Sequence, residues 1–272
     1  MSEPPHTPPH TPPAREPSRR LANPRWMGLL AALQDARSIT AAARAAGLSY
    51  KGAWDAIDAM NNLAGQALVE TVVGGRGGGG ARLTDRGREV LAAYRRLDTA
   101  SRHFAVAVAP GSGTDQGGAD ASDAVLLARL ALRASARNQL AGQVLAIRPG
   151  AVNDEVQVRL SSGAVLVATI TRESTALLGL APDQPVVALI KSTAVLVAAG
   201  AGPFALSARN QFPGTVTRCL PGAVNTEVVI AIGAGQSLAA IITRAAADAL
   251  ALVPGAAACA VFDAAAVILL CV

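Results

Sequence analysis

The hydrophobic pattern of the first third of the chain predicts helices. The first helix is indicated by apolar residues at intervals of three and four positions: Trp26, Leu29, Leu30 and Leu33. A short alanine-rich helix should open at Ser38-Ile39-Thr40. It should end at Gly47, because glycine commonly terminates a helix.

A third helix is predicted for the stretch "YKGAWDAIDAMNNL", for which Ser49 is a good N-cap. Helical spacing places Ala53, Ile57 and Met60 on its inward face. The outward positions are Tyr50, Lys51, Asp55 and Asp58. Two helices joined by a tight, glycine-containing turn form a helix-turn-helix, whose second helix can enter the major groove of DNA.

A glycine-tipped hairpin follows, with strands predicted at 68–73 and 81–84. Its tip, "GGRGGGG", matches the G-x-G-x-x-G pattern of dinucleotide-binding loops, but that pattern requires a helix to begin inside the glycine run. Here a strand returns first, and a long helix is predicted only from Asp85 to about Phe104. We therefore interpret the hairpin as the wing of a winged helix-turn-helix; the alternative is a surface hairpin in a small α+β domain.

The second half of the chain repeats itself. "SARNQLAGQVLAIRPGAVNDEV" at Ser135 recurs as "SARNQFPGTVTRCLPGAVNTEV" at Ser207, an offset of 72 residues, and 26 of 66 ungapped positions are identical. The first copy contains short runs of β-branched and small residues that predict strands: 143–147, 155–160, 165–170, 186–190 and 194–197. Several short strands at this spacing predict a small OB-like barrel, so the repeat predicts two barrels in tandem.

Composition narrows the class of protein. The 272 residues are 51% hydrophobic, enough for packed cores, yet no apolar run reaches the roughly 18 residues of a membrane span. No signal sequence is evident, so a cytoplasmic location with no membrane partner is expected. Three scattered cysteines and three histidines predict neither disulfides nor a site for a bare metal cation. Residues 1–108 hold 14 Lys and Arg against 9 Asp and Glu, whereas residues 109–272 hold 10 of each, which favours nucleic acid as the partner of the first part.

These observations predict an α+β multidomain chain. The expected parts are a disordered Pro/His-rich tail (1–22), a winged helix-turn-helix DNA-binding domain (23–108), a linker (109–123) and two OB-like barrels (124–200 and 201–272).

The two copies differ in residues that could bind an anion. Ser174, Lys191 and Ser192 occur in the first copy only, and the position of Lys191 is taken by Asp263 in the second. A deprotonated tetrahedral oxyanion presents only acceptor oxygens, so its receptor needs hydrogen-bond donors and positive charge. We therefore predict an anion half-site in the first copy; surface hydroxyls and a solvated lysine are the alternative.

Three motifs in this order, the helix "LSYKGAWDAIDAMNNL", the wing "GGRGGGGARLT" and tandem "SARNQ" repeats, resemble those of the ModE-type molybdate-responsive transcriptional regulators. The resemblance covers residues 23–272 and identifies the barrels as a di-Mop, or TOBE, sensor. It implies a cytoplasmic homodimer that binds molybdate or tungstate and a palindromic operator. Such regulators typically repress a molybdate-uptake operon when loaded and can activate genes of molybdenum enzymes. Gly52 departs from the family, in which many relatives carry serine.

The resemblance also implies site residues. The molybdate ligands would be Thr171, Ser174, Lys191 and Ser192 of one chain with Ser135 and Arg137 of the other. The DNA-contacting residues would be Ser49, Tyr50, Lys51, Trp54, Asp55, Arg76 and Arg82, although Trp54 could instead be a core residue.

Two other functions compete with this interpretation. A molybdate storage protein would bind several anions per chain and no specific DNA. An enzyme or transport ATPase subunit would need catalytic groups, but the chain lacks a G-x-x-x-x-G-K-[ST] phosphate loop and an evident His/Asp/Ser or Cys/His grouping, so no catalysis is expected.

Overall fold

The computed structural model describes residues 22–35, 38–72, 80–107 and 121–271. The predicted tail lies outside these residues except for Ala22, as do Arg76 and the predicted linker through residue 120.

The N-terminal region is a winged helix-turn-helix, as the apolar pattern predicts. Its elements are α1 (Pro24–Asp35), α2 (Ile39–Ala45), α3 (Tyr50–Ala64), β1 (Val69–Val72), β2 (Gly80–Leu83) and α4 (Asp85–Ala107). Ser49 caps α3 by accepting a hydrogen bond from the Gly52 backbone N–H, and Gly65 ends the helix with a left-handed φ of 68°. Ala53, Ile57 and Met60 are buried in the core, as predicted.

Helix α5 (Ala121–Leu130) begins inside the segment predicted as linker. Its Leu127 and Leu130 join the core of the N-terminal region. Arg86 of α4 forms an ion pair of 2.8 Å with Asp123 of α5, which is only 7% exposed. The first residues of α5 are small or polar, and its apolar positions cover barely two turns. The sequence therefore shows too little helical periodicity to predict this helix.

Two five-stranded antiparallel sheets follow. The elements from the first copy are β3 (Asn138–Arg148), β4 (Asn153–Leu160), β5 (Val165–Thr171), α6 (Arg172–Leu177), β6 (Pro185–Ile190), η1 (Ser192–Ala194) and β7 (Leu196–Ala199). Those from the second copy are β8 (Asn210–Pro221), β9 (Asn225–Gly233), β10 (Gln236–Thr243), α7 (Arg244–Ala249), β11 (Ala257–Phe262), η2 (Ala264–Ala266) and β12 (Ile268–Cys271).

The copies exchange their last strands. The first sheet has the order β12-β6-β3-β4-β5 and the second the order β10-β9-β8-β11-β7. The second copy therefore supplies β12 to the first sheet, and the first copy supplies β7 to the second. The boundary predicted between residues 200 and 201 follows the sequence repeat, whereas the hydrogen bonding crosses it.

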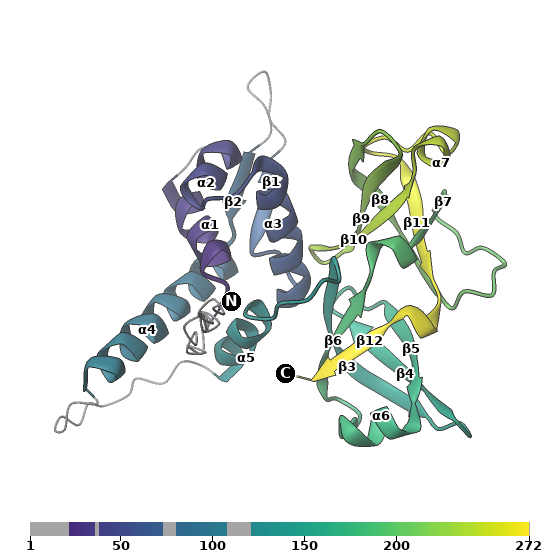
Figure 1. The fold of residues 1–272 in the computed structure, drawn as a ribbon, viewed down its shortest axis with the longest axis horizontal. Helices are drawn as coiled ribbons and strands as arrows, with labels where there is room; N and C mark the ends of the chain where they lie inside the picture. The colour runs from purple at the N-terminus through teal and green to yellow at the C-terminus, as the bar shows by residue number, and fades with distance from the viewer. Residues whose placement is uncertain (1–21, 36–37, 73–79, 108–120, 272) are drawn as a thin grey trace, which may run out of the picture.

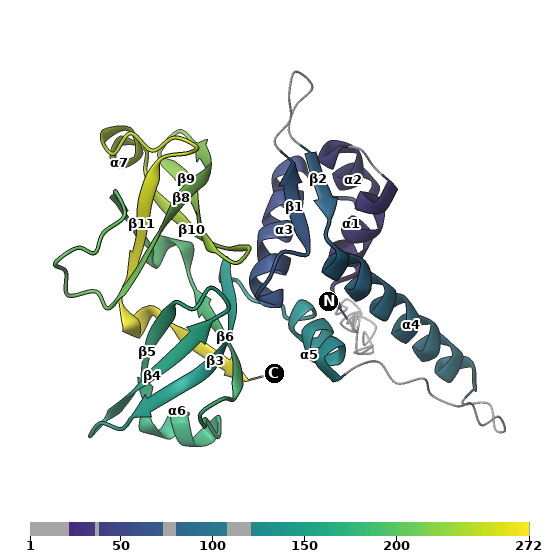
Figure 2. The ribbon, with the colours of Figure 1, turned by 180° about the vertical axis from the view of Figure 1, so that it is seen from behind.

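The two sheets lie one above the other, and the winged helix-turn-helix stands beside them (Figure 1). Seen from in front and from behind, α3 is the helix that faces the sheets (Figures 1 and 2). The contact is packed: Val187 of β6 is fully buried against the N-terminal core. The side-chain amide of Asn62 donates to the carbonyl of Ser237 (2.9 Å) and accepts from its backbone N–H (2.7 Å).

Candidate functional site

Four of the predicted anion ligands lie at one end of the first sheet. The last pair of the β3–β6 ladder is Asn138 with Ile190, so Arg137 and Lys191 follow it on the two strands, one residue beyond the ladder. Ser135 precedes Arg137 and is exposed, and Ser192, the first residue of η1, is only 7% exposed. Turn η1 packs against β10 of the second sheet. This end therefore combines two cations and two hydroxyls.

Thr171 and Ser174 form a second group. Their hydroxyl oxygens are 2.8 Å apart, and the Thr171 hydroxyl also caps α6 by accepting from the Ser174 backbone N–H at 3.1 Å. Thr171 pairs with Asn153 at the start of β4, which lies beside the far end of β3. The two groups thus lie at opposite ends of β3.

The resemblance groups these residues differently. It took Lys191 and Ser192 from the same chain as Thr171, whereas the single chain places them with Ser135 and Arg137. The reason is the antiparallel order of the sheet. The end of β6 meets the start of β3, whereas the end of β5 lies on the same side as the end of β3, with β4 between them.

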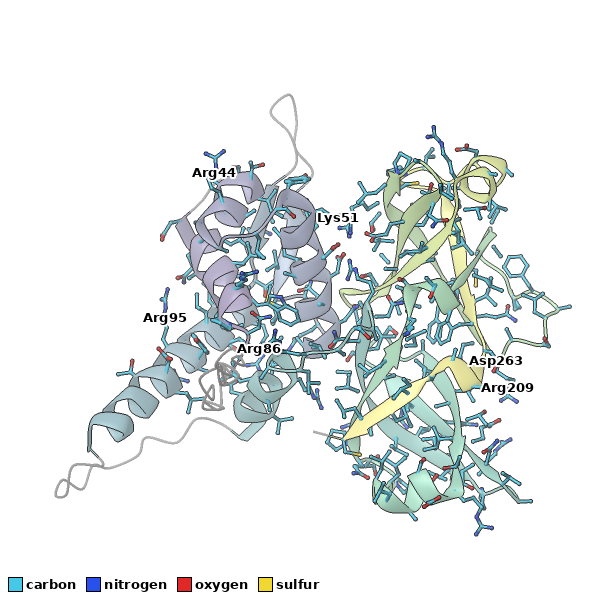
Figure 3. All side chains as sticks on the ribbon, viewed as in Figure 1. Arg44, Lys51, Arg86, Arg95, Arg209 and Asp263 are labelled. Carbon is cyan, nitrogen blue, oxygen red and sulfur yellow. The ribbon has the colours of Figure 1, made fainter. Side chains whose placement is uncertain are left out.

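The equivalent positions of the second copy have other partners. Asp263 occupies the position that Lys191 has in the first copy. Its carboxylate caps η2 by accepting a hydrogen bond from the Ala265 backbone N–H at 2.8 Å. Arg209, beside Asp263 in Figure 3, forms an ion pair of 3.5 Å with Glu155 of the first sheet. A carboxylate at the lysine position disfavours an anion there.

The predicted DNA-contacting residues of α3 fall into two groups: some lie against the N-terminal region or in solvent, and others point to the sheets. Tyr50 is 55% exposed and packs edge-on against Trp54, with ring centroids 6.3 Å apart. Trp54 is partly buried against the N-terminal core, so it serves packing at least in part. The Ser49 hydroxyl is occupied by its capping bond. Lys51 and Asp55, by contrast, point to the sheets, and Lys51 is labelled on that side in Figure 3.

A network of six charges joins α3 to the sheets. The guanidinium of Arg137 contacts Asp55 (2.8 Å) and Asp58 (3.2 Å). That of Arg218, in β8, contacts the same two carboxylates at 2.9 and 3.0 Å. Lys51 bridges Asp55 at 2.8 Å and Glu227 at 2.9 Å. Three cations and three carboxylates therefore balance at this interface.

Two groups of this network, Asp58 and Lys51, have raised pKa values for different reasons. Desolvation raises the pKa of Asp58 above its ordinary value, against the lowering effect of Arg218 and Arg137. For Lys51, burial lowers the pKa, but the hydrogen bonds to Asp55 and Glu227 outweigh it and the net shift is upward.

Sequence reasoning missed Arg218 and Glu227 and assigned Asp58 only to an outward face. One signal was available for Arg218: the second copy has this arginine where the first has Ala146. No local pattern, however, links it to a helix 160 residues away.

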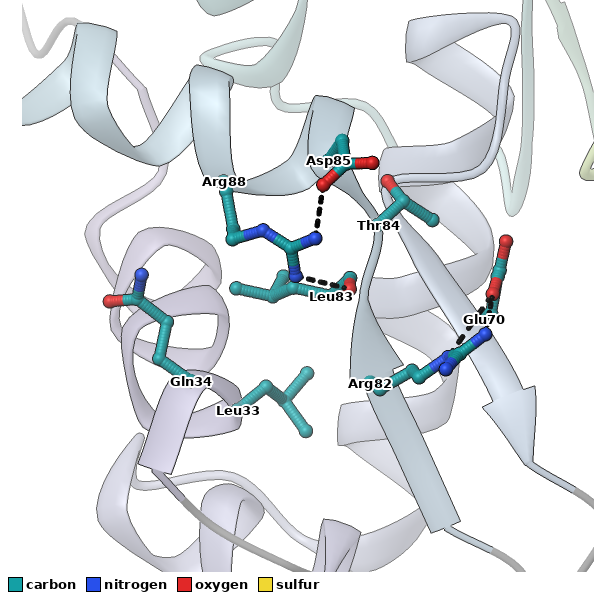
Figure 4. A pocket seen from close by; sticks show the side chains of 8 residues that line it. All are labelled: Leu33, Gln34, Glu70, Arg82, Leu83, Thr84, Asp85 and Arg88. Atoms are coloured by element: carbon teal, nitrogen blue, oxygen red, sulfur yellow. Dashed lines mark hydrogen bonds and ion pairs between the residues drawn. The ribbon is translucent and has the colours of Figure 1, made fainter.

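The wing contributes Arg82, which pairs with Glu70 across the hairpin at 3.2 Å. Both line a polar cavity of about 520 Å³ between α1, the hairpin and the start of α4 (Figure 4). Arg88 also lines this cavity and binds Asp85 and the Leu83 carbonyl, so both arginines that line it already have partners.

Within the described residues, no three His, Cys, Asp or Glu side chains are grouped so as to hold a metal ion. In the same part of the chain, no helix is long and apolar enough to cross a membrane.

Family models match the helix-turn-helix region and the two repeat copies separately. A family model described as a bacterial regulatory helix-turn-helix protein of the lysR family matches residues 24–88, and the TOBE domain model matches residues 134–197 and 206–269.

Similar proteins align along both parts. The chain is 43% identical to the molybdenum-pterin-binding protein MopA of Rhodobacter capsulatus, over 89% of each chain. It is 35% identical to the DNA-binding transcriptional dual regulator ModE of Escherichia coli K12, over 81% of this chain and 83% of that one. The solved structure of the cytoplasmic molybdate-binding protein ModG, with molybdate bound, matches 52% of this chain and all of its own at 42% identity, with a TM-score of 0.50.

Proposed function

Because the chain belongs to the ModE family of molybdate-responsive DNA-binding transcriptional regulators, we propose that it binds molybdate through its tandem sheets and operator DNA through α3 and the β1–β2 wing. One observation carries this function: relatives named as regulators align with the DNA-binding region and the sensor region together. The chain acts in the cytoplasm as a regulator and not as an enzyme.

The molybdate site is completed between two protomers. One chain supplies Ser135, Arg137, Lys191 and Ser192, and the other supplies the hydroxyl pair of Thr171 and Ser174. This division is supported by the positions of the two groups at opposite ends of β3. Each oxygen of the dianion then meets a donor, and the two guanidinium and ammonium charges offset its charge.

Tungstate binds in the same way, because it has the same charge and nearly the same size as molybdate. Sulfate is smaller, so its oxygens fall short of donors placed for molybdate.

A homodimer presents two copies of α3 and reads a palindromic operator with half-sites about one helical turn, or a multiple of it, apart. The loaded dimer represses a molybdate-uptake operon and activates genes of molybdenum enzymes. Storage of molybdate is the competing function, and the similarity of the sheets to ModG is compatible with it. The helix-turn-helix, which storage does not need, favours regulation.

Two measurements on the purified full-length protein test the proposal. Titration calorimetry with molybdate, tungstate and sulfate should give tight binding of the first two at about one anion per chain and none of sulfate. Footprinting on the DNA upstream of molybdate-uptake genes should show symmetric protection that depends on molybdate. Anion binding without specific DNA binding would support storage, and absence of both would refute the proposal.

A further inference from the structure

Two guanidinium groups from different repeat copies converge on two carboxylates of the recognition helix. Arg137 precedes β3 and Arg218 lies in β8, yet each contacts both Asp55 and Asp58 of α3, at 2.8 to 3.2 Å. The four side chains are only 16–27% exposed. Such charges are stable at an interface only while each has a partner of opposite sign.

Arg137 also belongs to the group proposed to bind the oxyanion. The carboxylates of Asp55 and Asp58 offer it what molybdate offers, namely negatively charged acceptor oxygens. Among the described residues, the Arg137 Nε atom is buried and has no acceptor, so this side of the guanidinium has no open approach in the docked arrangement. A dianion at Arg137 would also lie beside two carboxylates of the same sign, which disfavours simultaneous occupancy.

The same contact occupies the helix that would read DNA. Lys51 is held between Asp55 and Glu227, and Asp55 is held by the two arginines. Helix α3 also faces the sheets in both views of the molecule (Figures 1 and 2). A helix packed against protein on this face cannot place the same face in a major groove.

We propose that this docked arrangement is an autoinhibited state, in which Asp55 and Asp58 occupy the place of the oxyanion at Arg137, so that molybdate binding and α3 docking exclude each other. The inference rests on the proposed function and adds its regulatory step. Molybdate displaces the two carboxylates, the charge network loses its balance, and α3 is released for DNA.

An uncharged contact at the same interface offers a way to weaken docking without altering the charges around Arg137. Asn62 is 1% exposed and its amide makes two hydrogen bonds with the backbone of Ser237. Replacing it by alanine weakens docking without changing any charge near Arg137. Both Asp58→Asn and Asn62→Ala should therefore shift the equilibrium toward the released state.

The experiment is a calorimetric titration of molybdate into full-length protein and three variants. Asp58→Asn and Asn62→Ala should each bind molybdate about fivefold or more tightly than the unmodified chain, the lower end of typical couplings between sites. Asp248→Asn is the control, because it makes the same charge change in α7, where Asp248 is exposed and pairs with Arg244. It should bind molybdate with unchanged affinity. Circular dichroism melting confirms that each variant is folded.

The outcomes separate this inference from the proposed function. Unchanged or weaker molybdate binding in both folded variants, with normal binding by the unmodified chain, would overturn autoinhibition and leave the sensor intact. No binding by the unmodified chain would refute the molybdate site and the inference with it. A parallel DNA titration without molybdate should show gain of operator binding in Asn62→Ala, which keeps all predicted DNA-contacting residues.

Discussion

Asn138 and Asn210, 72 residues apart, make the same pair of hydrogen bonds to opposite sheets. The amide of Asn138 donates to the Ala239 carbonyl (2.9 Å) and accepts from its N–H (2.7 Å), and Asn210 does the same with Val167 at 2.8 and 2.7 Å. Each copy thus fastens the edge strand of the other, and the two repeats form one shared core.

This symmetry predicts that the two asparagines contribute equally to the free energy of unfolding. Asn138→Ala and Asn210→Ala should each lower the free energy of unfolding by about 1–3 kcal/mol, because each leaves a buried N–H and carbonyl without partners. Urea denaturation measures the change, and exposed Asn153 replaced by alanine is the control. A large difference between the two variants would contradict an equivalent role.

The strand exchange predicts where a C-terminal deletion acts. Removal of residues 268–272 takes away β12, which pairs with Val186 to Leu189 of β6. Hydrogen exchange should therefore accelerate in β6, in the first copy. Faster exchange confined to β11 would instead indicate that each copy folds as its own sheet.

Lys191 and Asp263 occupy equivalent positions and should behave differently. Lys191→Ala should weaken molybdate binding about ten- to hundredfold, the effect of losing a charge-assisted hydrogen bond of about 1.5–3 kcal/mol. Asp263→Ala should leave the affinity unchanged, since its carboxylate only caps η2. Calorimetry measures the molybdate affinity of both variants. An unchanged affinity in Lys191→Ala would show that this residue is not part of the site.

Thr171 and Thr243 provide a second matched pair. Both cap short helices, at 3.1 and 3.2 Å, so replacement of either by alanine should cost about 1 kcal/mol of stability. Only Thr171→Ala should also weaken molybdate binding, because Thr243 has Ala246 where Thr171 has Ser174. Equal molybdate affinities for the two variants would show that Thr171 serves as a cap alone.

Arg82 tests the wing. Its side chain is 71% exposed beside Glu70, a position that suits a phosphate contact. Arg82→Ala should weaken binding to all DNA sequences alike and reduce the slope of log affinity against log salt by about 1. A loss confined to the operator sequence would indicate base recognition by this arginine.

The sequence by itself determined the local structure and the chemistry. Apolar spacing placed Leu29, Leu30 and Leu33 on one helix face, and Ser49 marked the start of the recognition helix, because caps and periodicity act over a few residues. The chemical difference between the copies was also readable, since Lys191 in one copy and Asp263 in the other need no coordinates to compare. Helix α5 was missed because its apolar positions span too few turns to show a period.

Only the tertiary structure decided which of these groups meet. Similar repeats can pair their own strands or each other's with nearly the same local contacts, so the exchange of β7 and β12 leaves no mark in the repeat. The same holds for Arg218 and Asp58, which lie 160 residues apart and meet only because two domains pack together. Contacts of this kind depend on how whole faces fit and how their buried charges balance, and no spacing along the chain encodes that.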